Sequence, residues 1–165
     1  MHCDECGYDY DALTRPELAP ALRTDAAALR RSFERIPEGR VRTRPAPDVW
    51  SPLEYACHLR DVLDVQRERI LQVQTEDNPV FVPMGRDERV VDLRYNEQDP
   101  AVVAAELGAA AEALAATLDA LDPAGWTRTG VYNYPEPADR SVEWIARHTV
   151  HEIRHHHQDL GAAAS

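Results

Sequence analysis

The sequence predicts an all-α protein folded as a four-helix bundle. Four segments carry apolar residues at helical spacing, and each begins with capping residues typical of a helix N-terminus. Strand-like alternation is absent, apart from a short apolar run at residues 80–82 bounded by prolines. At 165 residues, of which 44% are hydrophobic and 28% charged, the chain is long enough to bury the core of one domain. Helices of this number and length are typical of a bundle.

The first and third predicted helices are bounded by cap residues and prolines. The first begins after Thr14, and its apolar positions end before Pro37. The third begins after Asp99 and continues through an Ala-rich stretch that ends at Asp122. Both starts place a proline in the first helical turn, where its missing N–H removes no intrahelical hydrogen bond.

The second and fourth predicted helices carry most of the histidines. Ser51 is the N-cap of the second helix, and Glu54 forms a capping box with it. This helix is expected to run to about Gln74, shortly before an Asn-Pro pair. The fourth helix is expected to begin near residues 139–141 and to be closed by Gly161, because glycine is common just after a helix.

These helices divide the chain into an N-terminal segment at residues 1–13, a bundle at residues 14–161 and a tail at residues 162–165. Two long connections, residues 75–98 and 122–139, exceed what a hairpin between antiparallel helices needs. Loops of this length are often functional, so they could wall a pocket, although their side chains could equally cap the bundle as ordinary packing. The side chains available for either role are Phe81, Met84, Tyr95, Trp126, Tyr132 and Tyr134.

The charge of the chain disfavours several function classes. Acidic residues outnumber basic ones by 29 to 18, and the net charge of −11 argues against nucleic acid as a partner. All basic residues are arginine, which excludes Schiff-base chemistry on lysine. The apolar stretches are interrupted by charges, so no membrane span is expected. Without a recognisable secretory signal or a disulfide framework, the chain is predicted to be cytoplasmic.

A histidine cluster in the fourth helix predicts a metal site. At about 100° per residue, Trp144, His148, His151 and His155 fall within one arc of roughly 60°. Histidines four residues apart stack two imidazoles on one helix face, as in helical zinc sites. His58, inside the second predicted helix, is the candidate third ligand. The sequence therefore predicts one divalent metal ion on His58, His151 and His155, with His148 outside the ligand set but open as an alternative.

The residues around His58 suggest supporting roles. Glu54 and Asp61 lie one turn before and after it, so either carboxylate could accept its second N–H or shuttle a proton in catalysis. Cys57 is expected to project toward the polar side of the helix. His156 and His157 are expected at the surface. The competing interpretation is a solvated histidine stripe, against which the Trp144 on the same arc argues.

The N-terminal Cys3-x-x-Cys6-Gly sequence has three interpretations. It could be half of a zinc knuckle completed by His2, by Cys57 or by another chain. It could be a redox pair, although such pairs usually stand at the start of a helix. It could also be a frayed terminus without a role.

Two segments resemble the DinB/YfiT-like superfamily. Residues 50–61, Trp-Ser-Pro-Leu-Glu-Tyr-Ala-Cys-His-Leu-Arg-Asp, are similar to its second-helix motif, a Trp-Ser start followed by His-Leu-x-Asp. The segment His151-Glu152-x-x-His155, followed by Gln158, is similar to its C-terminal motif. The resemblance implies a bundle of up-down-down-up topology. It also implies a metal bound by the same three histidines named above, commonly zinc or nickel.

The resemblance also suggests an activity. Members of the superfamily include S-transferases that use mycothiol or bacillithiol, which favours transfer of a low-molecular-weight thiol to an electrophilic small molecule. A metal-dependent hydrolase and a non-catalytic metal-binding stress protein remain alternatives. Zinc is the first choice of metal, with nickel or iron as alternatives. A homodimer is expected to pack through the small residues of the third helix, Ala105, Ala109 and Ala116.

Overall fold

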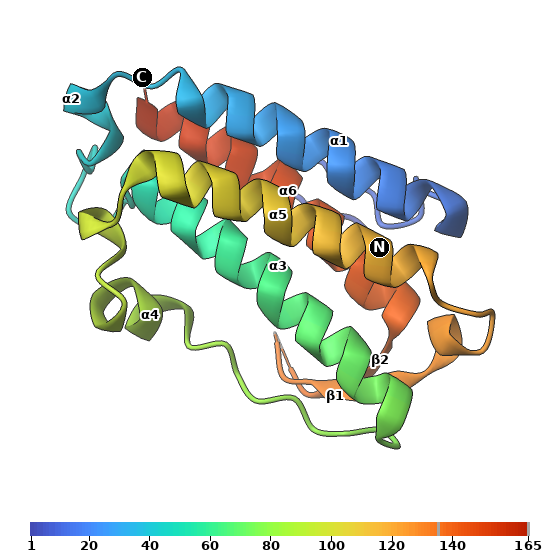
Figure 1. Cartoon of the computed structure of the whole chain (residues 1–165). Helices are drawn as coiled ribbons and strands as arrows, with labels where there is room; N and C mark the ends of the chain where they lie inside the picture. The colour runs from blue at the N-terminus through green and yellow to red at the C-terminus, as the bar shows by residue number, and fades with distance from the viewer. Residues whose placement is uncertain (135, 165) are drawn as a thin grey trace.

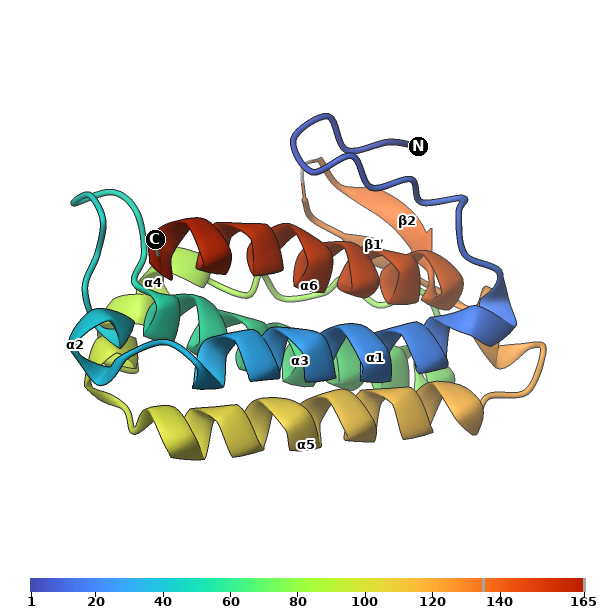
Figure 2. The same cartoon turned by 90° about the horizontal axis from the view of Figure 1, so that it is seen from above.

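The computed structural model describes residues 1–134 and 136–164 and confirms the four-helix bundle. The long helices lie side by side (Figures 1 and 2). Two of them, α1 and α6, run in one direction and α3 and α5 run in the other, which is the up-down-down-up topology (Figure 1). Their bounds are Arg15–Glu34 for α1, Pro52–Thr75 for α3, Pro100–Asp119 for α5 and Val142–Ala164 for α6.

The packing order places α6 between α1 and α3. Helix α1 packs against α5 and α6, and α3 packs against the same two helices. The core between them is filled mainly by leucines, and burying each contributes about 1.5–3 kcal/mol relative to leaving it exposed. The fully buried leucines are Leu18, Leu22, Leu29, Leu53, Leu59, Leu63, Leu107, Leu114, Leu118 and Leu160.

The cap chemistry expected from the sequence is present at two helix starts. The Ser51 hydroxyl accepts a hydrogen bond from the Glu54 N–H at 3.2 Å, and the Glu54 carboxylate accepts one from the Ser51 N–H at 2.8 Å. Asp99 accepts hydrogen bonds from the N–H groups of Ala101 and Val102. These contacts satisfy N–H groups that the first helical turn leaves without intrahelical partners.

The prediction that the last helix ends at Gly161 is wrong. Helix α6 continues through Gly161 to Ala164, so residues 162–164 of the predicted tail are helical. Gly161 has no positive φ, and a Cβ atom there would meet nothing within 4 Å. The alanines that follow have the highest helix propensity of any residue, and Ala163 is buried, so nothing stops the helix at the glycine.

Shorter elements occupy the connections between the long helices. The connection from α3 to α5 contains a short helix and a 3-10 turn, and the connection from α5 to α6 contains a 3-10 turn followed by a two-stranded hairpin. In these two connections the elements are α4 at Arg86–Asp92, η1 at Tyr95–Glu97, η2 at Gly125–Thr127, β1 at Thr129–Tyr132 and β2 at Ala138–Ser141. The four-residue helix α2, Glu38–Val41, lies between α1 and α3.

The hairpin was not predicted from the sequence. Strands β1 and β2 pair antiparallel, so α6 begins at Val142 rather than at residues 139–141. The apolar run at residues 80–82 adds to it, because the Phe81 N–H donates to the Val131 carbonyl at 3.0 Å. Each strand has four residues, too few for an alternating pattern to stand out against the surrounding loop.

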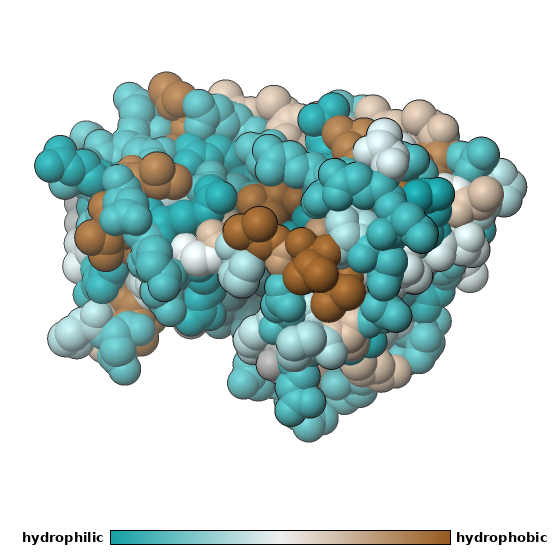
Figure 3. Space-filling view, turned by 90° about the horizontal axis from the view of Figure 1, so that it is seen from below, coloured by the Kyte–Doolittle hydropathy of each residue, from teal (hydrophilic) through white to brown (hydrophobic). Residues whose placement is uncertain are grey.

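The long connections pack most of their aromatic side chains into the core instead of leaving them around an open pocket. Tyr134 is exposed, and the connection between α3 and α4 also exposes Val80 and Val82. Figure 3 views the molecule from the side of this connection and shows a small hydrophobic group among hydrophilic residues. The buried members are Phe81, Tyr95, Trp126 and Tyr132.

Helix α5 is a longer apolar stretch than the sequence analysis expected of any segment. By length and composition alone, Pro100–Asp119 is apolar enough to cross one. Its leucines Leu107, Leu114 and Leu118 are buried against the neighbouring helices, an arrangement that a core helix also produces.

The contact between the hairpin and the α3–α4 connection generates a stability prediction. A Cβ atom at Gly130 would overlap the Phe81 ring, so Gly130→Ala forces the ring or the strand to move. We expect the free energy of unfolding to fall by about 1–3 kcal/mol, measured by thermal or urea denaturation. Gly39→Ala is the control, because a Cβ at Gly39 meets nothing within 4 Å. Equal stability of the two variants would contradict the packing.

Candidate metal centre

Two buried histidines and one partly buried carboxylate meet between α3 and α6. His58 from α3 and Glu152 and His156 from α6 offer ligand atoms that all lie within 4.8 Å of one another. Glu152 and His156 are four residues apart, so they project from the same face of α6. The His58 and His156 rings lie edge to face, with centroids 4.9 Å apart. We name these three residues the bundle centre.

His58 has no hydrogen-bond partner for either ring nitrogen in the described part of the chain. Only 2% of the residue is exposed, so water does not serve as a substitute partner. Burial lowers the pKa of His58 to about 3, which keeps the imidazole neutral. A neutral imidazole with an unused lone pair is the form that binds a metal ion.

The other two members of the bundle centre are held in place by charge interactions. Asp159 lies 2.8 Å from Nδ1 of His156, which leaves Nε2 facing the Glu152 carboxylate at 3.6 Å. Burial acts to lower the pKa of His156, but the carboxylates of Asp159 and Glu152 outweigh it and raise this pKa to about 9. Burial also opposes ionisation of Glu152, yet contacts with His151 and His156 hold its pKa well below the usual range.

This donor set fits a divalent transition metal. Two imidazoles and one carboxylate are a common set of protein ligands for catalytic zinc and for non-haem iron. A carboxylate beneath the second ring nitrogen, as Asp159 provides for His156, is the usual support of a metal-bound histidine. The two unpartnered nitrogens of His58 are explained if one of them binds the ion.

The structure divides the predicted triad of His58, His151 and His155 between two places. His151 and His155 gather with Cys3 and Cys6 of the N-terminal segment, whereas His58 gathers with Glu152 and His156. Among the residues described, no group of ligand atoms within 4.8 Å joins His58 to His151 or His155.

The physical reason is the rotation of about 100° between successive helical residues. Glu152 and His156 face α3, and the residue before each of them faces the N-terminal segment instead. The expectation that His156 lies at the surface is wrong, because it is 8% exposed. Its position could have been found from the core pattern of α6, in which buried residues recur at alternating spacings of four and three: Val142, Ala146, Thr149, Ile153, His156 and Leu160.

His148 also lies away from His58. Its ring stacks on Trp144 with centroids 4.8 Å apart, and its Nδ1 lies 2.8 Å from the Tyr10 hydroxyl. Tyr10 also stacks over Trp144. The arc of α6 that carries these residues is therefore covered by the N-terminal segment and is not a solvated stripe.

The two carboxylates proposed for catalysis are engaged in other contacts. Glu54 pairs with Arg44 at 2.6 and 2.8 Å in addition to its capping bonds. Asp61 accepts a hydrogen bond from the Tyr95 hydroxyl at 2.5 Å and pairs with Arg89 at 3.1 Å. Neither carboxylate bonds to His58, whose ring nitrogens have no partner among the described residues. Their contacts indicate that both residues hold the start of α3 against its neighbours.

Cys57 is also not where the sequence suggested. The side chain is fully buried, with its sulfur 3.7 Å from the Tyr95 carbonyl and from the Gln98 amide oxygen. Burial raises the pKa of the Cys57 thiol to about 12, so it stays protonated. A buried thiol of this kind behaves as a small apolar core residue.

Comparisons with known proteins identify the family. The DinB superfamily model matches residues 21–160, which include every member of the bundle centre. The chain belongs to the DinB superfamily. No curated protein matches the sequence at a significant level. The match to the superfamily model confirms the resemblance seen in the two sequence motifs.

Two solved structures of DinB-like architecture are similar to this chain. YfiT from Bacillus subtilis is 16% identical, with a TM-score of 0.84 over 94% of this chain and 90% of its own. Its structure is described as that of "a probable metal-dependent hydrolase with an unusual four-helix bundle topology". A mycothiol-dependent maleylpyruvate isomerase is 12% identical, with a TM-score of 0.76 over 93% of this chain and 63% of its own. At these identities the likeness shows the shared fold.

The geometry of the bundle centre predicts which histidines bind metal. His58→Ala and His156→Ala each remove a donor, so we expect metal affinity there to fall by at least about 100-fold, more than loss of a supporting residue costs. Metal analysis after competition with a chelator measures this. His157→Ala is the control, because its ring contacts Ser32 at 2.9 Å. Metal retention by all three variants alike would reject the assignment.

A second prediction separates structural from catalytic roles for Asp61. Asp61→Asn weakens the contacts with Tyr95 and Arg89, so we expect the free energy of unfolding to fall by about 1–3 kcal/mol. Metal content should stay at the wild-type level. Denaturation and metal analysis on the same sample test both statements, and loss of metal without loss of stability would place Asp61 at the centre instead.

Proposed function

We propose that this protein is a metal-dependent enzyme that transfers a low-molecular-weight thiol to an electrophilic small molecule. The observation that carries the proposal is the bundle centre, where buried His58 has no hydrogen-bond partner among the described residues and brings one ring nitrogen within 4.8 Å of ligand atoms of Glu152 and His156. Three protein donors leave a tetrahedral ion one position for an exchangeable ligand, which is the arrangement of catalytic sites. Zinc is the metal we propose, with nickel and iron as alternatives that metal analysis distinguishes.

The chemistry that a divalent ion supplies at such a site is Lewis acidity, which lowers the pKa of a bound water or thiol toward neutrality. The residues of this chain contribute position and charge. Glu152 and Asp159 fix the orientation of the His156 ring, and burial of His58 keeps its imidazole neutral and able to bind a metal ion.

The surroundings of the centre suit an anionic small molecule. The centroid of the Trp50 ring lies 5.1 Å from that of the His58 ring. The Arg86 guanidinium lies over the Trp50 ring, 5.1 Å from its centroid. Arg86 is more than half exposed, so it can approach a ligand without losing a buried partner. We propose that Arg86 binds a carboxylate or similar group of the substrate, because a guanidinium matches planar oxyanions with two hydrogen bonds.

Two observations bear on the choice of reaction. The similar maleylpyruvate isomerase is mycothiol-dependent, which favours a thiol as the co-substrate. The description of YfiT favours the alternative, hydrolysis of a small molecule. In the thiol reaction, sulfur forms a bond to an electrophilic carbon, the thiol proton passes to solvent, and a leaving group departs with its electron pair.

The test is a conjugation assay with the metal-loaded protein. Mycothiol, bacillithiol and glutathione are each offered with a panel of carboxylate-bearing electrophiles, and conjugates are detected by mass. We expect His58→Ala to lower the turnover rate by at least about 100-fold, since it removes a metal ligand, and Arg86→Ala to raise KM more than it lowers kcat. His157→Ala should act like the wild type.

Each other outcome has a defined meaning. Hydrolysis of ester or amide substrates without any thiol would replace the transferase proposal by the hydrolase alternative. Metal binding without turnover of either kind would favour a non-catalytic metal-binding protein. An Arg86→Ala variant with unchanged KM would remove Arg86 from the proposed substrate site.

A further inference from the structure

A second group of metal-binding side chains includes two residues of α6 that lie about 100° around the helix from Glu152 and His156. Cys3 and Cys6 from the N-terminal segment and His151 and His155 from α6 place one ligand atom each within 4.8 Å of the others. Two thiols and two imidazoles are the donor set of structural zinc sites. We infer that these four residues form a closed zinc site, separate from the bundle centre, which fastens the N-terminal segment to α6.

The N-terminal segment folds into a knuckle that presents both sulfurs on one side. The Cys3 N–H donates to the Tyr8 carbonyl at 2.9 Å, and the Gly7 N–H donates to the Cys3 carbonyl at 2.9 Å. Gly7 has a φ of +76°, a conformation that costs glycine little and other residues more. This turn brings the two cysteines together before any metal binds.

The two histidines leave one nitrogen each for the metal. The Nδ1 atom of His151 lies 3.1 Å from the Tyr10 hydroxyl, and Nε2 of His155 lies 3.6 Å from carboxylates of Glu5 and Asp159. The remaining atoms, Nε2 of His151 and Nδ1 of His155, are buried without a hydrogen-bond partner among the described residues. An unpaired buried nitrogen is costly, and a metal ion would satisfy both.

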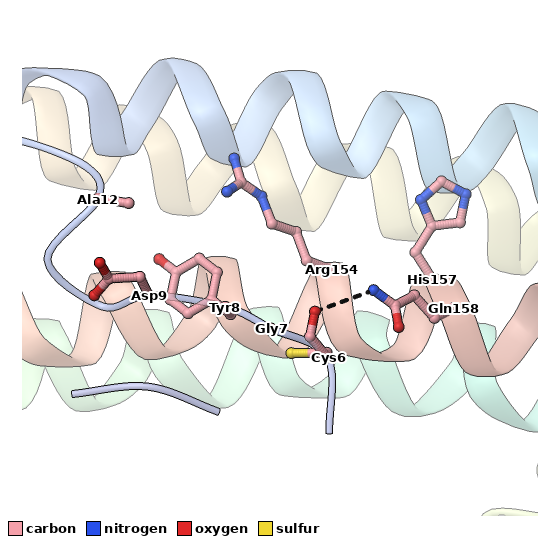
Figure 4. Close-up of a pocket in the computed structure, with 8 residues that line it drawn as sticks. All are labelled: Cys6, Gly7, Tyr8, Asp9, Ala12, Arg154, His157 and Gln158. Atoms are coloured by element: carbon pink, nitrogen blue, oxygen red, sulfur yellow. Dashed lines mark hydrogen bonds between the residues drawn. The ribbon is translucent and has the colours of Figure 1, made fainter. Parts of the chain in front are cut away.

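Other contacts hold the segment on α6, so the cysteines are not on a frayed terminus. Tyr8 and Tyr10 are buried, and Arg147 donates to the Tyr10 carbonyl at 2.8 Å. Figure 4 shows the knuckle lying along α6, with the Gln158 amide donating to the Cys6 carbonyl at 3.5 Å. Burial of both tyrosines fixes the segment in the register that brings the sulfurs to the histidines.

The second site differs from the bundle centre in its expected role. Its four protein donors complete a tetrahedral sphere and leave no position for water or substrate, as in structural zinc sites. It also touches the bundle centre through shared carboxylates. Glu152 lies 3.5 Å from Nδ1 of His151 and 3.6 Å from Nε2 of His156, and Asp159 contacts both His155 and His156.

Cobalt substitution tests the second site directly. Untagged protein is purified under reducing conditions, stripped with a chelator and titrated with Co²⁺. We expect about two ions per chain and a near-ultraviolet sulfur-to-cobalt absorption band, because only the second site has thiolate ligands. Cys3→Ser and Cys6→Ser should each lose the band and about one ion. His58→Ala should lose one ion and keep the band, so failure of one site is distinguishable from failure of the other.

Cys57→Ser is the matched control, because that sulfur is buried beside Tyr95 and should not contribute to the band. A second measurement needs no variant: zinc should protect Cys3 and Cys6 of the wild type from alkylation, and removal of zinc should expose them. A wild-type protein without the band, a band that Cys57→Ser abolishes, or a Cys3–Cys6 disulfide in protein kept under reducing conditions would each overturn the inference.

Discussion

The rotation of about 100° between neighbouring residues of α6 determines how this molecule distributes its ligands. Helix α6 is packed between α1 and α3 and is covered on another side by the N-terminal segment. Two side chains four residues apart project from the same face of the helix. The pair that starts one residue earlier projects from a face about 100° away. Glu152 and His156 consequently face α3 and His58, while His151 and His155 face the two cysteines. One short stretch of helix thereby supplies side chains of metal-binding types to two groups.

Burying these polar side chains lowers the free energy of unfolding unless their nitrogen and oxygen atoms find partners. An unpaired imidazole nitrogen inside a protein is destabilising, and this interior contains several, on His58, His151 and His155. The other nitrogens of the α6 histidines have partners, Asp159 for His156 and Tyr10 for His148 and His151. His151 and His155 each have one supported and one unsupported nitrogen, which is the pattern that a metal site requires of a histidine. The same polar interior would have little purpose in a purely structural bundle.

The N-terminal segment links the two groups to the fold as a whole. It lies outside the part of the chain that the DinB superfamily model matches, which begins at residue 21. Its tyrosines nevertheless belong to the core, and Tyr10 contacts His148 and His151 directly. The positions of the α6 side chains near Glu152 therefore depend on a segment at the other end of the sequence.

Sequence alone was sufficient for the elements whose signals are local. The capping box at Ser51 and the proline after Asp99 located two helix starts, and the apolar spacing located the bundle helices. The sequence did not predict the hairpin, because β1 is stabilised by a distant residue: Phe81, about fifty residues earlier, packs against Gly130. The sequence also did not predict that α6 continues past Gly161. A glycine ends a helix in this way where its backbone is left-handed, and Gly161 has no positive φ.

For the site, the sequence by itself determined the chemistry and the tertiary structure decided the grouping. His58, the histidine-rich stretch of α6 and the Cys3-x-x-Cys6 pair were all visible as metal-binding residue types. The two candidate pairs on α6, His151 with His155 and Glu152 with His156, are offset by a single residue. Which pair meets His58 depends on the face that α6 turns toward α3. That face is selected by packing of the core residues along α6, an interaction summed over the whole helix that no local spacing of histidines reveals.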